Sequence, residues 1–520
     1  MPSSPDVLGP AGRLASLRLD NAHMLLILSF AASIVAACVL AQTVYRIWFH
    51  PLAKVPGPMK YSVSYFPYLL QNYYRGVFFR KTPDLIQEYG PMIRVGPNHI
   101  MLDGEIAWPQ VFSRRKANEA EFEKLPVMFA AKAYSLIFAP HDIHRRQRRQ
   151  LNHAFSDASL AQQEGVVQKY IDLLLDRLQT HAENGEVVDA VKWMNACTFD
   201  IIGDLTLSES FSSLENNTVH PLITLIFDSI ELVSRRRLYA NYPRIRNILS
   251  CFSDELGFKQ HAARSGSKER ALARMKLGEE GPAGRKDFMT YMLRKTRDGE
   301  IGMEPEEVLE SSPTLILAGS ETTASALSAL WFYLSIHPEA YKRLTEEIRA
   351  SFSSEKEISF QTCTHLEYLV ATVNEILRIF PPAAETPARV SPGAFIEGIY
   401  IPPGTRVTTY QWATFRNPKH FKEPNSFIPE RWLPASHPLY DERFKNDNHA
   451  VFKPFSAGPR DCIGKNLALN ELRVVISRVL YRFDYDVIEG QDDWHQKQRL
   501  FTVWKKGPLM LRLKTREGVA

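Results

Sequence analysis

The sequence has few cysteines, and their scattered positions exclude several kinds of site. Five cysteines form no CxxC pair and no cluster with histidine, and they stand at Cys38, Cys197, Cys251, Cys363 and Cys462. Structural zinc sites and disulfide frameworks need such grouping, so neither is expected. No long basic tract accompanies the net charge of +5, which argues against a nucleic-acid partner. The chain also has no internal repeat and no flavin or nicotinamide motif.

Length and periodicity indicate a mainly α fold with minor β. At 520 residues the chain exceeds the usual size of one hydrophobic core, so two lobes are expected. The helical spacing of apolar residues is clearest at 160–180, 188–207, 305–337 and 366–379. Short β-like segments occur at 92–95, 100–102, 398–401, 406–409, 501–504 and 509–513. Residues 254–287 are rich in charged residues and glycine, and we expect an exposed connector there.

A long run without charged residues lies near the N-terminus, at 24–44. A helix of about 20 apolar residues can span a bilayer. The aromatic and basic flank that follows, with Tyr45, Arg46 and Trp48, is typical of a cytoplasmic membrane interface. A cleaved signal peptide is the alternative, but its apolar core is normally shorter and less far from the N-terminus. We therefore expect a tail at 1–23, a transmembrane anchor at 24–44, a basic and proline-rich hinge at 45–58, and a globular domain at 59–520.

The run from Phe455 to Gly464, FSAGPRDCIG, places Cys462 between two glycines. If this cysteine binds a haem iron, each neighbour has a use. Gly458 and Gly464 would let the backbone pass close to a flat ring, because no Cβ intervenes. Arg460 can offer a permanent charge to a haem propionate. The apolar helical spacing after Gly464 would put the cysteine near a helix N-terminus, which lowers the pKa of a thiol. A buried cysteine that packs as a small hydrophobe is the alternative.

This run resembles the signature of the cytochrome P450 haem-thiolate family, Phe-x-x-Gly-x-Arg-x-Cys-x-Gly, at every fixed position. The resemblance implies heme b as cofactor, Cys462 as the axial iron ligand, and Phe455 packed against the haem near the thiolate. It also implies the fold of that family, a large helical lobe and a small β-rich lobe, here with an N-terminal transmembrane helix.

A second motif lies inside the helix expected at 305–337, where the sequence reads Ala318-Gly-Ser-Glu-Thr-Thr. A glycine inside a helix costs about 1 kcal/mol relative to alanine, so Gly319 calls for a reason. The Thr322 hydroxyl can bond the carbonyl four residues earlier and loosen the helix, which would open a groove beside Gly319. A helix with two tolerated threonines is the alternative. The pattern resembles the distal motif of the same family, which implies that Thr322 helps to protonate dioxygen and that Glu321 relays protons.

Glu375 and Arg378 form a Glu-x-x-Arg pair on an expected helix. Such pairs are ordinarily surface contacts, and Glu346 and Arg349 show the same pattern. The first pair is followed by Phe-Pro-Pro and then by Arg431 in Pro-Glu-Arg-Trp, an order that resembles the family. The resemblance implies that Glu375, Arg378 and Arg431 form a buried structural network.

The resemblance implies further contacts to the haem propionates. In the basic stretch 141–150, family members usually carry Trp-x-x-x-Arg, and this chain has His144-x-x-x-Arg148 instead. Arg148 carries over, while His144 departs from the pattern but can still donate a hydrogen bond. Arg389 follows the Glu375 helix where the family places another propionate ligand. The other arginines of the stretch could form a positive surface for an acidic electron donor, namely Arg145, Arg146 and Arg149.

The function that the resemblance implies is a monooxygenase that inserts one atom of O2 into an apolar small molecule. Two electrons would come from NADPH through NADPH-cytochrome P450 reductase. The stretches 45–52 and 145–156 resemble filamentous-fungal members of secondary metabolism, so the substrate would be a terpenoid, polyketide or alkaloid. We expect a monomer, anchored by a single pass in the endoplasmic reticulum membrane, with a cytosolic catalytic domain. The alternatives are a haem-thiolate isomerase or dehydratase that needs no O2, and a non-enzymatic haem-binding sensor or carrier.

By the same resemblance, the pocket for the substrate is expected to contain small side chains that leave room for a bulky ring system. The residues expected to face it are Phe129, Leu315, Ala383, Ala384, Glu385, Thr386 and Phe501.

Overall fold

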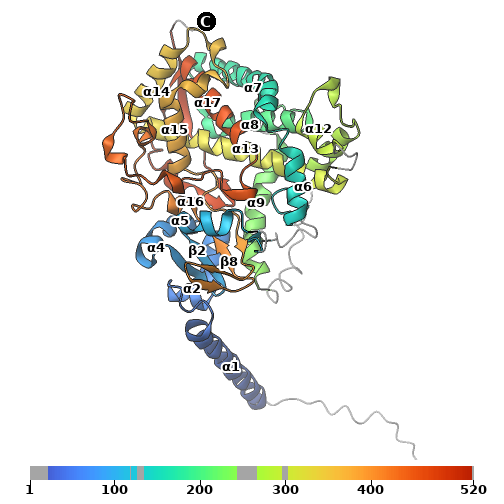
Figure 1. Ribbon diagram of the computed structural model, residues 1–520, viewed down its shortest axis with the longest axis vertical. Coiled ribbons are helices and arrows are strands. Elements are labelled where there is room, and N and C mark those ends of the chain that lie inside the picture. The colour runs from blue at the N-terminus through green and yellow to red at the C-terminus, as the bar shows by residue number, and fades with distance from the viewer. Residues whose placement is uncertain are drawn as a thin grey trace, which may run out of the picture. The chain divides into compact units, whose positions relative to one another are not determined.

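The structure is a computed structural model that describes residues 21–116, 119–125, 134–218, 220–242, 266–295 and 302–517. By its internal contacts the chain forms two units, residues 1–54 and 55–520. The first unit contains helix α1 (Asn21–Val44) and the short π-helical turn η1 (Tyr45–Phe49), drawn in dark blue in Figure 1. The helical segment His23–Phe49 is long and apolar enough to cross a membrane, which is compatible with the expected anchor.

The strands of the second unit include a five-stranded sheet with the order β1-β2-β8-β5-β3. Figure 1 shows β2 and β8 beside the short helices α2, α4 and α5. β1 and β2 form an antiparallel hairpin whose strand residues are all buried, β2 runs parallel to β8, and β3 pairs with β5. The last pairing sets Lys124 opposite Arg389. The strands are β1 (Met92–Gly96), β2 (His99–Leu102), β8 (Arg406–Thr408), β5 (Arg389–Val390) and β3 (Glu123–Lys124).

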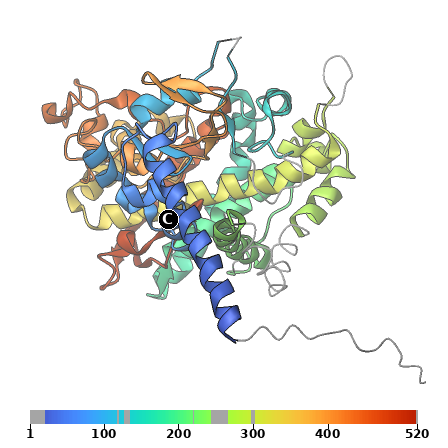
Figure 2. The ribbon, with the colours of Figure 1, turned by 90° about the horizontal axis from the view of Figure 1, so that it is seen from below.

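The larger part of the second unit is helical and is organised around α13 (Pro305–Ser335), the yellow helix in Figures 1 and 2. Nearly every residue of α8 (Ala190–Leu207) is buried, and this helix packs along α13. Most residues of both helices are buried, as expected for helices in the core of a large domain. Three further long helices pack around this pair, namely α7 (Asp157–Glu183), α15 (Glu367–Ile379) and α17 (Lys465–Arg482).

Shorter elements complete the second unit. The remaining strands form a sheet of β4 (Val187–Asp189), β12 (Met510–Thr515) and β9 (Phe483–Val487), and two hairpins, β6 (Ala394–Ile396) with β7 (Ile399–Ile401) and β10 (Arg499–Phe501) with β11 (Val503–Lys505). Among the described residues, further α-helices include α2 (Met59–Val63), α3 (Phe66–Leu69), α4 (Thr82–Tyr89), α5 (Gly104–Ala107), α6 (His141–Leu151), α9 (Pro221–Ala240), α12 (Phe288–Leu293), α14 (Pro338–Ser351), α16 (Gln411–Thr414) and α18 (Trp494–Lys497).

The predicted fold class, mainly α with minor β, is confirmed, and the four long helices lie where the periodicity places them. Two local predictions are wrong. The strand expected at 501–504 is the turn of a hairpin, because the chain reverses at Thr502, which has φ +77°. The connector expected at 254–287 contains a helix at 266–275 in its described part. Arg274 of that helix forms a buried ion pair with Asp287 at 2.6 Å, and this pairing lets charged residues leave the surface.

The proline-rich end of the expected hinge is attached to the sheet. The Arg94 N–H of β1 donates to the Pro56 carbonyl at 2.7 Å. A Cβ on Gly57 would lie 2.4 Å from the Arg94 carbonyl oxygen, so glycine is required for this approach. Residues 55–58 therefore belong to the second unit by their contacts.

Candidate active site

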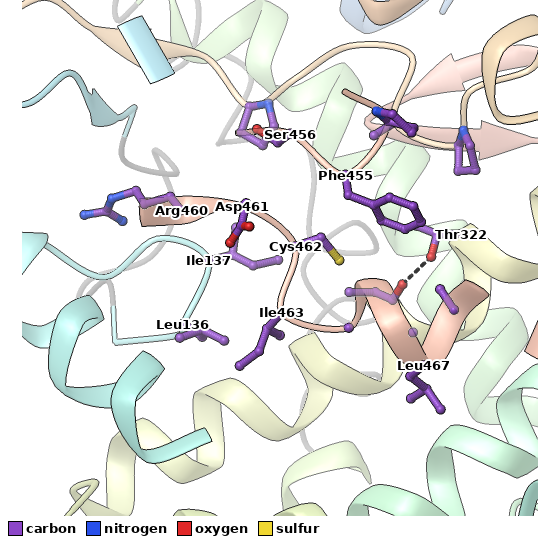
Figure 3. Close-up of a pocket in the computed structure, with 18 of the residues that line it drawn as sticks. Leu136, Ile137, Thr322, Phe455, Ser456, Arg460, Asp461, Cys462, Ile463 and Leu467 are labelled. Carbon is purple, nitrogen blue, oxygen red and sulfur yellow. Dashed lines mark hydrogen bonds between the residues drawn. The ribbon is translucent and has the colours of Figure 1, made fainter. Parts of the chain in front are cut away.

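Cys462 lies in a tight loop between the short turn η11 (Gly458–Arg460) and helix α17. The Cys462 N–H donates to the Phe455 carbonyl at 2.9 Å, which closes the loop. Gly458 has φ +76°, and a Cβ there would lie 1.9 Å from the Phe112 carbonyl oxygen, so only glycine fits. Figure 3 shows the Cys462 side chain pointing from this loop toward a space that Phe455 and Thr322 also border.

This space is a cavity of about 300 Å³ between the cysteine loop and α13. Cys462 and Thr322, which belong to motifs far apart in the sequence, both line it. Large parts of the walls are apolar, with side chains from Leu136, Ile137, Ile202, Leu315, Ala318, Ala326, Ile463 and Leu467. The cavity is therefore suited to a flat apolar group that contacts the cysteine on one side and α13 on the other.

The pKa of the Cys462 thiol is raised, whereas its position before a helix suggests a lowered one. Burial raises the pKa of the thiol, although the Gly464 backbone N–H and Arg148 act in the opposite direction. Cys462 lies three residues before the first residue of helix α17, Lys465. A bound metal ion favours the deprotonated thiol, and the thiolate form of Cys462 would depend on such an ion.

The second motif has the local geometry that the sequence predicts for Thr322. The Thr322 hydroxyl donates to the Ala318 carbonyl at 2.7 Å and lies at the cavity. Gly319 was expected to help open a groove in the helix. The structure gives a different reason for glycine, because a Cβ there would lie 2.6 Å from Cδ1 of Ile202 on α8. Glycine at this position lets α8 and α13 approach closely, and Gly319 and Ile202 both border the cavity.

Glu321 does not line the cavity, although the adjoining Thr322 does. The Glu321 side chain is 1% exposed and forms an ion pair with Lys506, which directly follows β11 and is 2% exposed. Ser325 donates to Oε1 of Glu321 at 2.9 Å and contacts Nζ of Lys506 at 2.8 Å. The two residues that the motif assigns to proton transfer therefore lie on different faces of α13.

Five basic residues line the cavity near one another, namely Lys124, His144, Arg148, Arg389 and Arg460. Burial and the neighbouring cations lower the pKa of Lys124 to about 7 and that of His144 to about 3. Burial, together with Arg460, lowers the pKa of Arg389 to about 10. In the described part of the chain, Nε of Arg389 and both Nε and Nη2 of Arg460 are buried without a hydrogen-bond partner.

Buried cations without partners are costly, so this cluster calls for an anionic ligand. The two propionate groups of heme b fit that requirement, and the apolar walls fit its ring. Gly464 supports the fit, because a Cβ there would touch only the Phe155 side chain, at 3.7 Å, while the residue borders the cavity. Glycine at 464 therefore leaves room that no described protein atom fills, and Cys462 borders the same cavity.

Arg148 serves the cysteine loop as well as the cavity. Its two terminal nitrogens donate to the backbone carbonyl and the carboxylate of Asp461, at 2.6 and 2.8 Å. His144, the departure from the family pattern, is buried at the cavity beside it. Lys124 was not predicted as a site residue from the sequence, because a lysine in an acidic stretch is expected to lie on the surface. Only the pairing of β3 with β5 brings it to the arginines.

The predicted ion-pair network of Glu375 is confirmed. Arg378 approaches the Glu375 carboxylate at 2.8 Å and Arg431 at 3.3 Å, and all three side chains are 0% exposed. Arg349 of the matching surface pattern pairs with Asp484 instead of Glu346. The network joins α15 to the segment that leads toward the cysteine loop.

The predicted pocket residues are divided by the structure. Leu315, Ala383 and Thr386 line the cavity. Ala384, Glu385 and Phe501 do not, and Phe129 lies outside the described residues. Glu385 instead accepts hydrogen bonds from Asn72 and Tyr68, and Phe501 packs near Gly76. The cavity is also lined by residues that were not predicted, namely Leu136, Ile137, Ile202, Thr314 and Pro382. Leu136, Ile137 and Pro382 lie in turns, where periodicity does not give the direction of a side chain, and Ile202 and Thr314 reach the cavity through the packing of α8 and α13.

A cysteine loop, a helix facing it with a threonine hydroxyl at the cavity, and a cluster of buried basic residues are the features expected of the haem-thiolate class of proteins. The family model "Cytochrome P450" matches residues 56–513. The chain is 39% identical to cytochrome P450 monooxygenase aclL of Aspergillus oryzae, over 92% of this chain and 96% of the relative. It is 34% identical to trichothecene C-15 hydroxylase of Fusarium sporotrichioides, over 92% of this chain and 96% of the relative. It is 35% identical to trichothecene C-4 hydroxylase of Trichoderma arundinaceum, over 93% of this chain and 96% of the relative. The chain belongs to the cytochrome P450 family, with heme b as cofactor, and is a haem-thiolate monooxygenase.

Proposed function

We propose that this protein is a membrane-anchored monooxygenase of fungal secondary metabolism that hydroxylates a bulky apolar ring compound. The observation that carries the proposal is the cavity that has Cys462 and Thr322 on its walls, beside the buried Arg389 and Arg460, which have nitrogens without a hydrogen-bond partner among the described residues. A redox partner, O2 and an organic substrate are implied by the monooxygenase class. We assign the electron supply to NADPH-cytochrome P450 reductase.

When bound, heme b supplies the chemistry that activates dioxygen. Around it, we assign Cys462 to the iron and Arg389, Arg460 and Lys124 to the propionates, with Arg148 and His144 beside them. Phe455 and Gly464 border the cavity on the side where the ring would bind, and Gly458 lets the loop pass close to the Phe112 carbonyl. Thr322 is assigned to hold a proton at its hydroxyl, because Oγ1 has a donor function and lies at the cavity.

Glu321 is assigned to supply protons to Thr322, and this role requires the carboxyl to leave Lys506. The sequence leaves two alternatives, an O2-independent isomerase or dehydratase and a haem-binding sensor. The monooxygenase and hydroxylase relatives do not favour them.

For the substrate, the apolar walls and the small Ala383 favour a large ring system of few charges. Two relatives are named as trichothecene hydroxylases, so trichothecenes lead the panel of compounds to test, followed by other terpenoids, polyketides and alkaloids. Replacing Ala383 by phenylalanine should abolish binding of the bulkiest ligands. If the binding spectra of every bulky compound stay unchanged in this variant, the proposed substrate site is wrong.

For the location, α1 is proposed as a single-pass anchor in the endoplasmic reticulum membrane, with the catalytic domain in the cytosol and the protein as a monomer. Arg145 and Arg149 of α6 are exposed and suit an acidic electron donor, whereas Arg146 is paired with Glu307 at 2.6 Å. The reductase docking surface is therefore proposed around Arg145 and Arg149.

The test uses the full chain in yeast microsomes with a fungal reductase. The reduced, carbon-monoxide-bound spectrum should have the thiolate-type band, and product should form only with NADPH, reductase and O2. Turnover that persists without O2 would favour the isomerase or dehydratase, and haem binding without turnover of any compound would favour the sensor.

A further inference from the structure

Glu321 is held out of the cavity by the C-terminal hairpin. Lys506, the residue after β11, forms an ion pair with Oε1 of Glu321, and Ser325 contacts both partners. The other carboxylate oxygen, Oε2, is buried and has no hydrogen-bond partner among the described residues. One oxygen of the Glu321 carboxylate is therefore held by the Lys506 cation, and the other oxygen lacks a hydrogen bond among the described residues.

Burial works against both charges of this pair. It raises the pKa of Glu321 and lowers the pKa of Lys506, and each partner offsets the effect on the other. Transfer of one proton from Nζ of Lys506 to the Glu321 carboxylate would leave a neutral amine and a neutral acid. A neutral acid is no longer held by charge, so this transfer would free the carboxyl group to rotate about its side chain.

The hairpin that carries Lys506 also contacts the cavity wall and α9. The Trp504 indole donates to the Pro381 carbonyl at 3.0 Å, and the next residue, Pro382, lines the cavity. Lys505 forms an ion pair with Glu231 of α9. A displacement of the cavity wall by a ligand would thus reach the hairpin, and the hairpin ends at the lysine that holds Glu321.

We propose that Lys506 is a positioning residue that keeps Glu321 from delivering protons to Thr322 until a substrate in the cavity shifts the hairpin. The proposal rests on the proposed function, in which Thr322 and Glu321 supply protons at the haem. Its consequence is that the enzyme without substrate wastes little NADPH, because proton supply to the cavity is withheld.

Proton supply can be measured without knowing the substrate, because reduced P450 enzymes consume O2 in two balanced ways. One NADPH and one proton convert O2 to hydrogen peroxide, and two NADPH and two protons convert O2 to two molecules of water. The second route breaks the O–O bond and needs protons delivered inside the cavity. The water-forming share of NADPH consumption therefore reports on that delivery.

The experiment compares full-length wild type, Lys506→Met, Lys506→Arg, Glu321→Gln and the double variant in microsomes with reductase and no added substrate. NADPH consumption and hydrogen peroxide are measured per haem, which is counted by the carbon-monoxide spectrum. Lys514→Met is the matched control, since Lys514 is an exposed lysine of β12 paired with Asp486. Its rates should equal those of the wild type.

We expect Lys506→Met to raise water-forming NADPH consumption about tenfold, a part of the 10²- to 10⁴-fold that general acid catalysis contributes. Lys506→Arg should restore the wild-type rate, because arginine keeps the cation. The double variant should behave as Glu321→Gln alone, because Lys506 acts only through Glu321. A purely structural lysine would lower haem content without this dependence on Glu321.

The proposal is overturned if Lys506→Met has the wild-type rate per haem, or if the double variant keeps the increase. It is also overturned if Glu321→Gln leaves the ratio of water to peroxide unchanged in both backgrounds. These results are distinct from failure of the proposed function, which would appear as absence of the thiolate-type band or of O2-dependent product in the wild type.

Discussion

Replacing Glu375 by glutamine should destabilise the folded protein far more than the same change at Glu346, although both residues begin a Glu-x-x-Arg pattern. The Glu375 carboxylate accepts from Nε and Nη2 of Arg378, each at 2.8 Å, and also from the Ile428 N–H at 2.7 Å. It also pairs with Arg431. Glutamine keeps the size of the side chain but removes the charge that both buried arginines share.

Breaking a buried ion pair by removing one partner costs about 3–5 kcal/mol. Arg378 keeps bonds to three backbone carbonyls, and Arg431 keeps its ion pair with Asp447. Because these contacts retain part of the network, we expect the lower end, about 3 kcal/mol, or roughly 10²-fold in the ratio of folded to unfolded protein. At the exposed Glu346, whose pair with Lys342 spans 4.0 Å, the change should stay within about 0.5 kcal/mol.

The difference should also depend on pH. Burial raises the pKa of Glu375, but Arg378 and Arg431 outweigh it and hold the pKa below its ordinary value of 4.5. A carboxyl group with a depressed pKa in the folded state stabilises the fold at pH values above its unfolded pKa. That stabilisation is lost as the pH falls through the folded pKa. The gap between wild type and Glu375→Gln should therefore be full at neutral pH and shrink below about pH 4.

The assay is the urea dependence of the thiolate-type carbonyl band, measured on full-length protein in microsomes. Wild type and Glu346→Gln should lose the band at nearly the same urea concentration, and Glu375→Gln at a much lower one. Equal midpoints for the two glutamine variants would refute the argument that burial distinguishes the two pairs.

Three other variants test the site. Cys462→Ala should abolish the thiolate-type carbonyl band, and a retained band would assign the iron to another ligand. Arg460→Leu should stabilise the haem-free protein, because Nε and Nη2 of Arg460 have no hydrogen-bond partner there. The same variant should lose haem to apomyoglobin faster than the wild type. If the variant is stabilised without haem and also keeps its haem longer, or is worse in both respects, the propionate assignment is contradicted. Gly319→Ala should cost about 1–3 kcal/mol through the contact with Ile202, as measured by thermal loss of the carbonyl band. Adding Ile202→Ala should recover part of that cost if the contact between α8 and α13 is the cause.

Local sequence spacing was sufficient to predict the structure where the interacting residues belong to one loop or one helical turn. The Cys462 loop and the bond from Thr322 to Ala318 are of this kind, because backbone geometry over a few residues determines them. The long helices were also predictable, since apolar periodicity over several turns leaves little choice. The hairpin at Thr502 was not predicted, because a turn centred on one residue does not change the pattern of apolar residues in a short segment.

Contacts between distant segments could not be predicted in the same way. Lys124 reaches the cavity only through the pairing of β3 with β5, and Lys506 reaches Glu321 only because the C-terminal hairpin packs against α13. The sequence also does not show which side chains point into the pocket. For example, Ala383 borders the cavity and the adjoining Ala384 does not.

By itself, the sequence determined the class of chemistry, because the proposed iron ligand Cys462 and the residues that surround it in the motif lie within one run of ten residues. Family membership, helix positions and the apolar N-terminal segment followed from the same local patterns. The tertiary structure alone decided which cations surround the cavity and on which face of α13 Glu321 lies. The physical reason is that burial and pairing of charges are properties of segments brought together by folding, and their energies depend on neighbours that are remote in the chain.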